Sequence, residues 1–480
     1  MKKNQILFIL LILGVQLNAQ NLFNRTYGGG SYDEGVHGLE TTDGFFILST
    51  VSSSGPGLTA IHLMKLDTAG EIIWEKHYGG EKINRAVYMT YSASGNELFI
   101  LSYSNSFNDE NDYDIYLLKT DLNGDTLWTK TFEWEDWDIP TKIKTLNDSN
   151  LVICGGTYSF GNNQEAFIFK IDNDGDSLWL KTYGDINNDM FKGIGEQSNG
   201  DLIAAGYKEN GDAYKQAWVL KTNSNGIGID SISIGENDKH DYFTDLKVYT
   251  GDFIALSGST TSYGAGGQDV LAIRLRPDLN IYFEYYHGDI EDDYANSVDI
   301  QLSGDVVYAG FSESYGIGNG DAYIIYYQFN FFNFAPTFGG TERDITNNIT
   351  SLSDNTFLAV GTTESFDPGL SAIYVLKIDR VSIDNNVIIN DEKEVLDNNI
   401  KVYPNPTTNQ FLVDFSSYNN MGKINVRIYD FIGNLVLDEE YSNMQNEKLL
   451  IQSEAWKSGI YMLQIQSKDQ TIYQSKIIKN

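Results

Sequence analysis

The sequence predicts an all-β protein in two parts, a seven-bladed β-propeller followed by a small C-terminal β-sandwich. An aromatic-Gly step recurs at intervals of 51, 54, 51, 51, 53 and 51 residues between Gly28 and Gly339. Each repeat offers about four short apolar runs separated by Gly, Asn, Asp and Ser, and no stretch has helical periodicity. After Asp379 the repeat is lost, and alternating apolar positions with Gly-centred turns continue to the last residue. Four strands per unit of this length is the pattern of a propeller blade.

The overall charge argues against two classes of binding partner. The 480 residues include 33 Lys and Arg against 66 Asp and Glu, a formal charge of −33. Nucleic acids and anionic membrane surfaces both require a basic footprint, so the composition argues against binding to either. A surface of one sign opposes self-association and favours cations or neutral partners.

The N-terminus predicts export. Lys2 and Lys3 precede an apolar stretch from Ile6 to Leu17, and Ala19 follows it. This order is typical of a secretory signal peptide over residues 1–19, and the apolar stretch is too short for a membrane span. No other segment is long and apolar enough to cross a bilayer.

The single cysteine is predicted to be structural. An exported chain enters an oxidising space, yet Cys154 has no partner for an intrachain disulfide. It ends the apolar run 151–154, where a small buried hydrophobe is expected rather than a nucleophile.

Each repeat carries the same landmarks. The aromatic-Gly step and its variants are Tyr27-Gly28, Tyr78-Gly79, Phe132-Glu133, Tyr183-Gly184, Ile234-Gly235, His287-Gly288 and Phe338-Gly339. Five residues before it stand Phe23, Trp74, Trp128, Trp179, Asp230, Phe283 and Phe334. Five residues after it stand Asp33, Asn84, Asp138, Asp189, His240, Asp293 and Asp344, with Asp241 beside the His. A residue repeated this often is expected to hold the same turn in every blade rather than to perform catalysis.

The ends of the array predict how the ring closes. The seventh unit stops at residues 377–379 without its last strand, whereas residues 22–27 form an orphan copy of that strand. Pairing the first and last segments would leave no long sheet edge exposed. We therefore expect a propeller over residues 20–380 that is closed by strand 22–27.

The repeat also resembles a known family. The phrase Trp179-Leu180-Lys181-Thr182-Tyr183-Gly184-Asp185, the later Asp and the small-residue strand endings are similar to the seven-bladed propeller repeat of secreted bacterial proteins. The resemblance covers residues 21–380 and implies the fold more than an activity.

Residues 381–400 are rich in Asn, Asp and Glu and are expected to be a linker to a domain over residues 401–480. That domain carries Tyr-Pro-Asn-Pro, Tyr-Asp-x-x-Gly, Gly-Ile-Tyr and terminal Lys motifs, at Tyr403, Pro404, Asn405, Pro406, Tyr429, Asp430, Gly433, Gly459, Tyr461, Lys476 and Lys479. These pieces resemble the type A sorting domain of the type IX secretion system of Bacteroidetes. The resemblance implies passage through the periplasm, contact with the secretion machinery, and release or attachment at the outer-membrane surface. An ordinary C-terminal sandwich is the alternative.

Two candidate sites follow from the repeat. The loop between the second and third strands carries an aromatic residue in five blades, namely Phe107, Phe160, Tyr263, Tyr315 and Phe366. Such rings are expected either to hold an extracellular glycan or protein or to pack each loop on its own blade. Asp172, Asp174 and Asp176 alternate in a turn that is either a plain Asp-x-x-Gly turn or a weak calcium site. No other cofactor is predicted.

No catalytic residues can be assigned from the sequence. The five His show no metal-ligand spacing, and no Ser, His and Asp set stands out. The prediction is a secreted or surface-displayed, non-catalytic binding or adhesion module. A hydrolase or lyase acting on extracellular polysaccharide or peptide is the alternative, and an envelope component without a ligand is a third. An unrepeated carboxylate pair at the channel mouth would favour an enzyme, whereas a repeat-symmetric face would favour the other two.

Overall fold

The computed structural model describes residues 22–28, 30–108, 112–328, 331–366, 370–379, 400–404, 407–415, 423–430, 435–442, 447–457, 459–467 and 470–479. The chain divides into two compact units, residues 1–389 and 390–480. The described residues of both units form strands, turns and loops, without a helix. The predicted signal peptide and most of the predicted linker lie outside the described residues.

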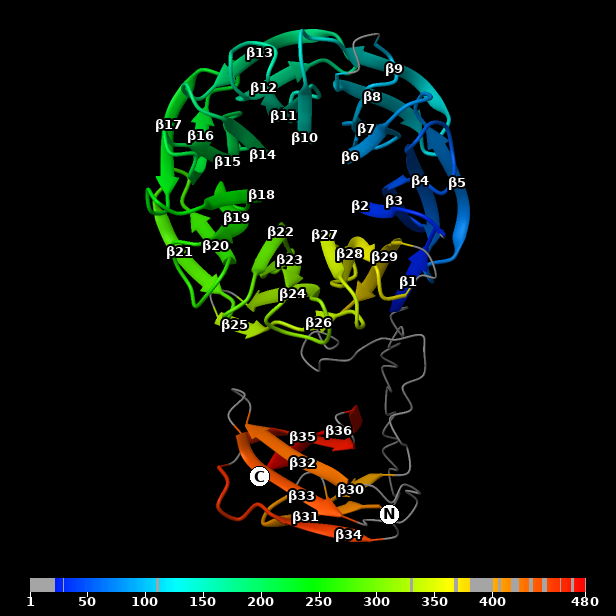
Figure 1. Ribbon diagram of the computed structural model, residues 1–480, viewed down its shortest axis with the longest axis vertical. Coiled ribbons are helices and arrows are strands. Elements are labelled where there is room, and N and C mark those ends of the chain that lie inside the picture. Colours follow the sequence, from blue (N-terminus) through cyan, green and yellow to red (C-terminus); the bar gives the residue numbers. More distant parts are fainter. Residues whose placement is uncertain are drawn as a thin grey trace, which may run out of the picture. The chain divides into compact units, whose positions relative to one another are not determined.

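The first unit is a ring of seven β-sheets around a central axis (Figure 1). We number the sheets as blades in chain order. Blades one to three consist of β2 (Asp33–Thr41), β3 (Gly44–Val51), β4 (Ala60–Asp67), β5 (Ile72–Tyr78), β6 (Asn84–Tyr91), β7 (Glu97–Ser104), β8 (Asp114–Asp121), β9 (Thr126–Phe132), β10 (Asp138–Thr145), β11 (Leu151–Thr157), β12 (Glu165–Ile171) and β13 (Ser177–Tyr183). Blades four and five consist of β14 (Asp189–Glu196), β15 (Leu202–Glu209), β16 (Lys215–Thr222), β17 (Gly228–Ile234), β18 (Asp241–Tyr249), β19 (Phe253–Thr260), β20 (Asp269–Leu275) and β21 (Ile281–His287).

Blade six has a divided outer strand. It consists of β22 (Asp293–Ile300), β23 (Val306–Ser312), β24 (Asp321–Gln328), β25 (Phe331–Phe334) and β26 (Thr337–Phe338). Both short strands pair with β24, and Pro336 lies between them. Proline has no N–H to donate to the sheet, so the strand is interrupted there.

Blade seven closes the ring with the first strand of the chain. Its order is β1 (Phe23–Tyr27), β29 (Ala372–Ile378), β28 (Phe357–Thr363) and β27 (Asp344–Ser351). The antiparallel register runs from Phe23 opposite Lys377 to Tyr27 opposite Ile373. Figure 1 shows β1 beside β29 at the junction with blade one.

The middle strands are buried over most of their length. Every residue of β3 and β11 is buried, whereas the outer strands β5 and β9 are half-exposed. Each blade packs its two faces against its neighbours, so its middle strands are near-continuous apolar runs, and the core divides into clusters between adjacent blades. Cys154 is fully buried in one of these clusters.

The strands nearest the axis share one irregularity. These inner strands are β2, β6, β10, β14, β18, β22 and β27 (Figure 1). Each has a bulge at the same place in its pairing with the second strand, at Val36, Val87, Thr141, Lys192, Thr244, Asn296 and Asn347. A bulge re-aims the side chain of the extra residue. Four of these side chains donate a hydrogen bond to a backbone carbonyl of the next inner strand, at distances of 2.6–3.1 Å, namely those of Thr141, Thr244, Asn296 and Asn347.

The second unit is a small two-sheet domain. One sheet has the order β30 (Lys401–Tyr403), β31 (Gln410–Asp414) and β34 (Lys448–Gln452). The other has the order β33 (Leu435–Ser442), β32 (Lys423–Asp430), β35 (Gly459–Ser467) and β36 (Gln470–Lys479). Side chains from both sheets, including Phe411 and Val426, form one apolar core. A search of the described residues found no helix long and apolar enough to span a membrane.

Candidate functional site at the channel mouth

The repeated Asp anchors the loops of each blade. Asp293, at the start of an inner strand, is fully buried, and its Oδ2 accepts hydrogen bonds from Ser314 Oγ at 2.5 Å and from the backbone N–H of Asp289 at 3.1 Å. In blade five Asp241 takes this place and accepts from Ser262, while His240 precedes the strand. The carboxylate therefore ties two loops together on one face of the ring, which we call the loop face, as expected of a turn-holding residue.

Burial of these carboxylates makes stability depend on pH. Burial is the main cause that raises the pKa of Asp138 to about 7. A group whose pKa is raised on folding contributes stability that is complete below its unfolded pKa of 3.8 and is lost as the pH rises through about 7. We therefore expect the melting temperature to increase as the pH is lowered from about 8 to about 5.5. Asp138→Asn, which mimics the protonated form, should flatten this profile, and an equally steep profile in the variant would contradict the assignment.

The five aromatic residues of the predicted ligand-binding loops each contact a ring of their own blade or the adjoining turn. The ring centroids lie 4.4–5.8 Å apart in the pairs Phe107–Tyr116, Phe160–Trp134, Tyr263–Tyr286, Tyr315–Tyr323 and Phe366–Tyr374. Phe160 is 48% exposed, and it is the most exposed of the three that leave a large apolar surface in solvent, the others being Phe107 and Phe366. Binding by these rings stays a prediction.

The predicted calcium turn is held by its own backbone. Asp172 Oδ1 accepts the N–H groups of Asp174 and Asp176 at 2.9 and 2.8 Å. The carboxylate of Asp176 pairs with Lys130 at 2.6 Å. In the described part of the chain no group of three His, Cys, Asp or Glu side chains is arranged to hold a metal ion. Calcium at this turn stays a prediction.

A ring of side chains from the inner strands lies within the channel, and sequence reasoning did not find it. The residue after each bulge differs in every blade, being His37, Tyr88, Lys142, Gly193, Asp245, Ser297 and Asn348. The Lys142 ammonium forms an ion pair with Asp245 two blades away, with both side chains buried. Ser297 Oγ donates to Asp245 Oδ2 at 3.1 Å, and Asn348 Nδ2 donates to Ser297 Oγ at 3.3 Å.

The other half of this ring is aromatic. The rings of His37 and Tyr88 are in contact, with 3.8 Å between their centroids and 40° between their planes, and Lys142 Nζ lies 5.0 Å from the Tyr88 centroid. Gly193 lets the inner strand of blade five approach blade four closely, because a Cβ there would lie 2.8 Å from the backbone nitrogen of Leu246. The sequence does contain a signal for this ring. At the repeat position after the bulge, the seven copies differ in chemical type.

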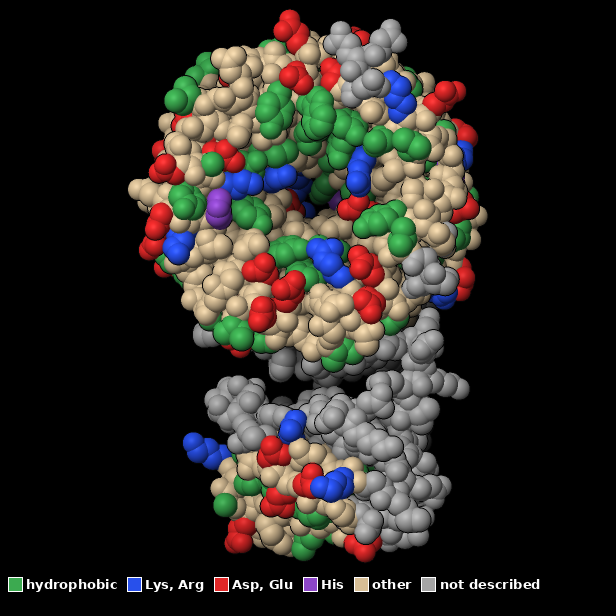
Figure 2. All heavy atoms as spheres, viewed as in Figure 1, with side chains coloured by type: hydrophobic (Ala, Val, Ile, Leu, Met, Phe, Trp, Pro, Cys, Tyr) green, Lys and Arg blue, Asp and Glu red, His purple; other side chains and the backbone are tan. Residues whose placement is uncertain are grey.

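Above this ring, the loop-face end of the channel carries aromatic and basic side chains. We call it the channel mouth. Figure 2 shows Lys or Arg and hydrophobic side chains around the central opening of this face. The channel mouth consists of Arg85, Tyr103, Tyr113, Trp137, Lys192, Tyr207, Lys215, Tyr242, Tyr294, Phe311 and Arg343. It opens onto a cavity of about 200 Å³ lined in part by Tyr88, Lys142, Lys192 and Asp245.

Local contacts orient the bases of the channel mouth. Lys215 Nζ lies 4.3 Å from the ring centroid of Tyr207 and 5.7 Å from that of Tyr242. Arg343 donates to Tyr294 OH at 2.9 Å, and its guanidinium lies 4.8 Å from the Phe311 ring centroid. Aromatic faces hold cations in place without neutralising their charge.

Three of the four bases at the channel mouth lack a carboxylate partner. Arg85 pairs with Glu34 at 2.9 Å, but Lys192, Lys215 and Arg343 form no ion pair with any residue in the described ranges. Burial and the positive charge of Lys215 lower the pKa of Lys192 to about 8. Lys192 is also the one charged residue among the seven bulge positions.

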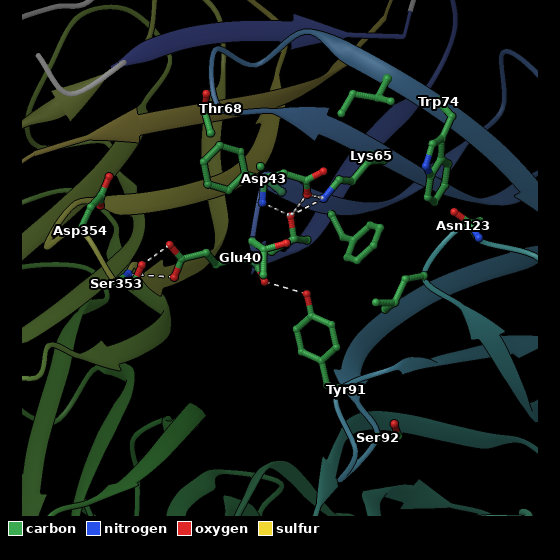
Figure 3. A pocket seen from close by; sticks show the side chains of 18 of the residues that line it. Glu40, Asp43, Lys65, Thr68, Trp74, Tyr91, Ser92, Asn123, Ser353 and Asp354 are labelled. Atoms are coloured by element: carbon green, nitrogen blue, oxygen red, sulfur yellow. Dashed lines mark hydrogen bonds and ion pairs between the residues drawn. The ribbon is translucent and has the colours of Figure 1, made fainter. Parts of the chain in front are cut away.

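On the opposite face of the ring, by contrast, the basic side chains form ion pairs. A cavity of about 1030 Å³ lies there across blades seven, one and two (Figure 3). Its charged groups are already engaged, because Lys65 pairs with Asp43 at 2.6 Å and Lys377 pairs with Asp354 at 3.0 Å. Equivalent pairs recur in other blades, at Lys119–Glu97, Lys170–Asp148 and Lys221–Asp201. This repetition indicates a structural role for the pairs.

A triad-like set in blade one cannot act as a nucleophile. Ser49 Oγ lies 3.0 Å from His62 Nδ1, and His62 Nε2 lies 3.2 Å from Glu75 Oε2. Burial, with the neighbouring His77, lowers the pKa of His62 to about 4. Ser49 is completely buried, so its hydroxyl is closed to a substrate.

Comparison with known families settles the role of the second unit. Residues 401–480 match the family model of the secretion system C-terminal sorting domain. The chain carries a type IX secretion sorting domain. The sorting domain directs the protein to the cell surface or the extracellular space and implies contact with the secretion machinery. Its motif residue Tyr403 donates to Asp414 Oδ2 at 2.7 Å and accepts from Lys448 Nζ at 2.8 Å.

The structure describes some of the remaining motif residues of the sorting domain and not others. Tyr461 is buried and donates to the backbone carbonyl of Lys457 at 2.9 Å. The backbones of Pro404, Tyr429, Asp430, Gly459, Lys476 and Lys479 are described, whereas Asn405, Pro406 and Gly433 lie outside the described residues.

Similarity to individual proteins is limited. An endo-acting ulvan lyase of Formosa agariphila is 28% identical over 89 residues, which is 18% of this chain. The chain spans 16% of the length of that relative, and an alignment this short cannot cover the propeller.

Solved structures resemble the chain only loosely. The polysaccharide lyase Uly1 has 10% identity and a TM-score of 0.45, covering 74% of this chain and 92% of its own. Sqt1 from Chaetomium thermophilum has 12% identity and a TM-score of 0.42, covering 71% and 82%. The Hadza microbial sialidase Hz136 has 10% identity and a TM-score of 0.40, covering 72% and 75%.

Proposed function

We propose that the propeller is an extracellular binding module that recognises an acidic polysaccharide at the channel mouth. The observation that carries this proposal is the set of three bases that form no ion pair among the described residues, Lys192, Lys215 and Arg343, of which the last two lie over aromatic rings. The protein as a whole has a charge of −33, so these bases stand out locally against an acidic background. The channel mouth is neither repeat-symmetric, which would favour a binding or structural role, nor built on an unrepeated carboxylate pair, which would favour an enzyme.

The chemistry of the channel mouth suits a sugar acid or a sulfated sugar. Guanidinium and ammonium groups bind carboxylate and sulfate oxygens through charge-assisted hydrogen bonds. The faces of exposed rings such as Trp137, which is 46% exposed, offer apolar surface to the C–H groups of a sugar. A neutral polymer would use the rings but would leave the three cations without partners.

Binding to a panel of acidic and neutral polysaccharides tests the proposal. We expect the mature protein to bind an acidic member saturably and more weakly as salt is raised. Arg343→Ala and Lys215→Ala should each weaken binding about tenfold, the effect of losing one hydrogen bond to a charged group.

Lys130→Ala is the matched control, because Lys130 is paired with Asp176 away from the channel mouth. The control should bind like the parent and melt at the same temperature. Equal binding of neutral polymers, or equal losses in all three variants, would reject the channel mouth as the site.

A lyase is the second candidate, and Lys192 favours it. An amine with a pKa of about 8 can accept a proton near neutral pH, as a general base must. The relative that shares 89 aligned residues is named an ulvan lyase, which agrees with this alternative. Appearance of the ultraviolet absorbance of unsaturated uronic acid on incubation with an acidic polysaccharide, and its loss in Lys192→Met, would replace the binding proposal with this one.

A further inference from the structure

Two junctions between adjacent blades, one between blades five and six and one between blades six and seven, share a loop sequence. The proposed function does not use it. Ser262–Asp269 in blade five and Ser314–Asp321 in blade six both read Ser-Tyr-Gly-x-Gly-x-x-Asp. In each, the final Asp is the first residue of the third strand of the blade, β20 or β24. The same position is Ala60, Glu165, Gln216 and Ala372 in four other blades, so the carboxylate is not required by the fold.

Each of these two carboxylates has one oxygen engaged and one free. Asp269 Oδ2 accepts the N–H of Ala265 at 3.0 Å, and Asp321 Oδ2 accepts that of Ile317 at 2.5 Å. Both residues are only 1% exposed, and the Oδ1 atom of each has no hydrogen-bond partner among the residues that the structure describes. A buried charged oxygen without a partner costs free energy unless a ligand satisfies it.

The free oxygens point at a second carboxylate across a glycine. A Cβ built on Gly288 would clash with Asp269 Oδ1 and with Asp293 Oδ2 of the next blade. A Cβ built on Gly339 would likewise clash with Asp321 Oδ1 and Asp344 Oδ2. In each junction two carboxylate oxygens of different Asp residues therefore lie against one glycine, where a larger residue would clash.

No base neutralises these two pairs. In the described ranges no Lys or Arg forms an ion pair with Asp269, Asp293, Asp321 or Asp344. Burial, helped by the charge of Asp344, raises the pKa of Asp321 to about 7. Burial and the charges of Asp293 and Asp289 raise the pKa of Asp269 as well.

We infer that each of the two junctions binds one divalent cation between the carboxylates of adjacent blades, with Ca²⁺ as the cation that fits best. The ligands that the chain offers are hard carboxylate oxygens from the first residues of strands, which Ca²⁺ accepts in irregular geometry, whereas Mg²⁺ demands a near-ideal octahedron. Because the chain is exported, we expect a dissociation constant for Ca²⁺ of about 0.1–1 mM, the range of extracellular calcium-binding modules. The cation would tie blades five, six and seven together.

A third carboxylate pair is built differently. Asp114 and Asp138 also face each other between blades two and three. There Asn108 donates to Asp114 Oδ2, and Glu133 stands where the other junctions have glycine. We therefore propose no cation for this junction.

Calcium titration of the mature protein, freed of metal by chelation, tests the inference. Calorimetry should find two equivalents of Ca²⁺ in the parent, one in Asp269→Asn, one in Asp321→Asn and none in the double variant. Added Ca²⁺ should raise the melting temperature of the parent and leave that of the double variant unchanged. The turn variant Asp172→Ala/Asp174→Ala is the matched control and should keep both equivalents.

Terbium luminescence gives a readout that needs no variant. Tyr315 lies near Asp269 and Asp293, and Tyr374 lies near Asp344 and Asp321. Tb³⁺ bound at these junctions should therefore be sensitised by tyrosine excitation and displaced by Ca²⁺. The absence of saturable Ca²⁺ uptake, or uptake that the turn variant abolishes and Asp269→Asn/Asp321→Asn does not, would overturn the inference. Stabilisation by acid alone, without Ca²⁺ uptake, would show that the carboxylates share a proton and would overturn it too.

Discussion

Deleting residues 20–28 should lower the stability of the whole propeller, not of one blade. The deletion removes β1, whose five residues pair with β29, and takes the buried Phe23 out of the core shared by blades seven and one. Loss of a buried Phe alone costs about 3–5 kcal/mol. The exposed edge of β29 would add to this cost, because its backbone groups lose their partners. We expect a fall in melting temperature of about 10 °C or more in a single cooperative transition.

Thermal unfolding followed by circular dichroism measures this effect. Arg25→Ala is the matched control, since Arg25 lies in the same strand but its partly exposed pair with Glu71 contributes about 1 kcal/mol at most. A deletion variant that melts like the parent would reject closure by the first strand. A separate low-temperature transition would show instead that blade seven unfolds independently.

Lys142→Met should be the most damaging single substitution in the channel. It leaves the buried carboxylate of Asp245 with Ser297 Oγ and the backbone N–H groups of Leu246 and Val298 as its donors, and without a counter-charge. Removing one partner of a buried ion pair costs about 3–5 kcal/mol. The effect should be a loss of global stability, because the pair links blade three to blade five.

The double variant Lys142→Met/Asp245→Leu separates the pair from the packing around it. Replacing both charges by apolar side chains is often neutral, so the double variant should recover most of the loss. Chemical denaturation gives the free energy of unfolding of the parent, both single variants and the double variant. These four values yield the coupling free energy between Lys142 and Asp245. Additive losses in the double variant would contradict the assigned ion pair. Lys130→Ala, which breaks an exposed pair, should change stability by less than about 1 kcal/mol.

Repetition explains why the fold could be predicted from one sequence. The spacing of the aromatic-Gly steps sets the blade count, and the orphan strand at 22–27 sits where a missing fourth strand is needed. Residues that recur, such as Asp293 and its equivalents, hold the same loop in each blade, so their role can be inferred from their recurrence. The sorting motifs were equally readable because they form an ordered set within one short domain.

The candidate site could not be predicted in the same way. The charge total favoured cationic or neutral partners, yet the structure gathers Lys192, Lys215 and Arg343 on one face. Lys192 and Lys215 lie on different strands of blade four, Arg343 directly precedes β27 of blade seven, and the three residues have no common motif. The loop aromatics, which the repeat brought to attention, contact rings of their own blades or adjoining turns.

The sequence by itself determined the all-β class, the seven blades, the closing strand and the sorting domain, because each of these depends on a pattern that is local or periodic along the chain. Only the tertiary structure decided which side chains meet at the axis. There Gly193 has no side chain, and Lys142 crosses the gap to reach Asp245. The physical reason is that a ring brings the same repeat position of seven distant segments to one place. The contacts there depend on differences between the copies, whereas the fold depends on what the copies share.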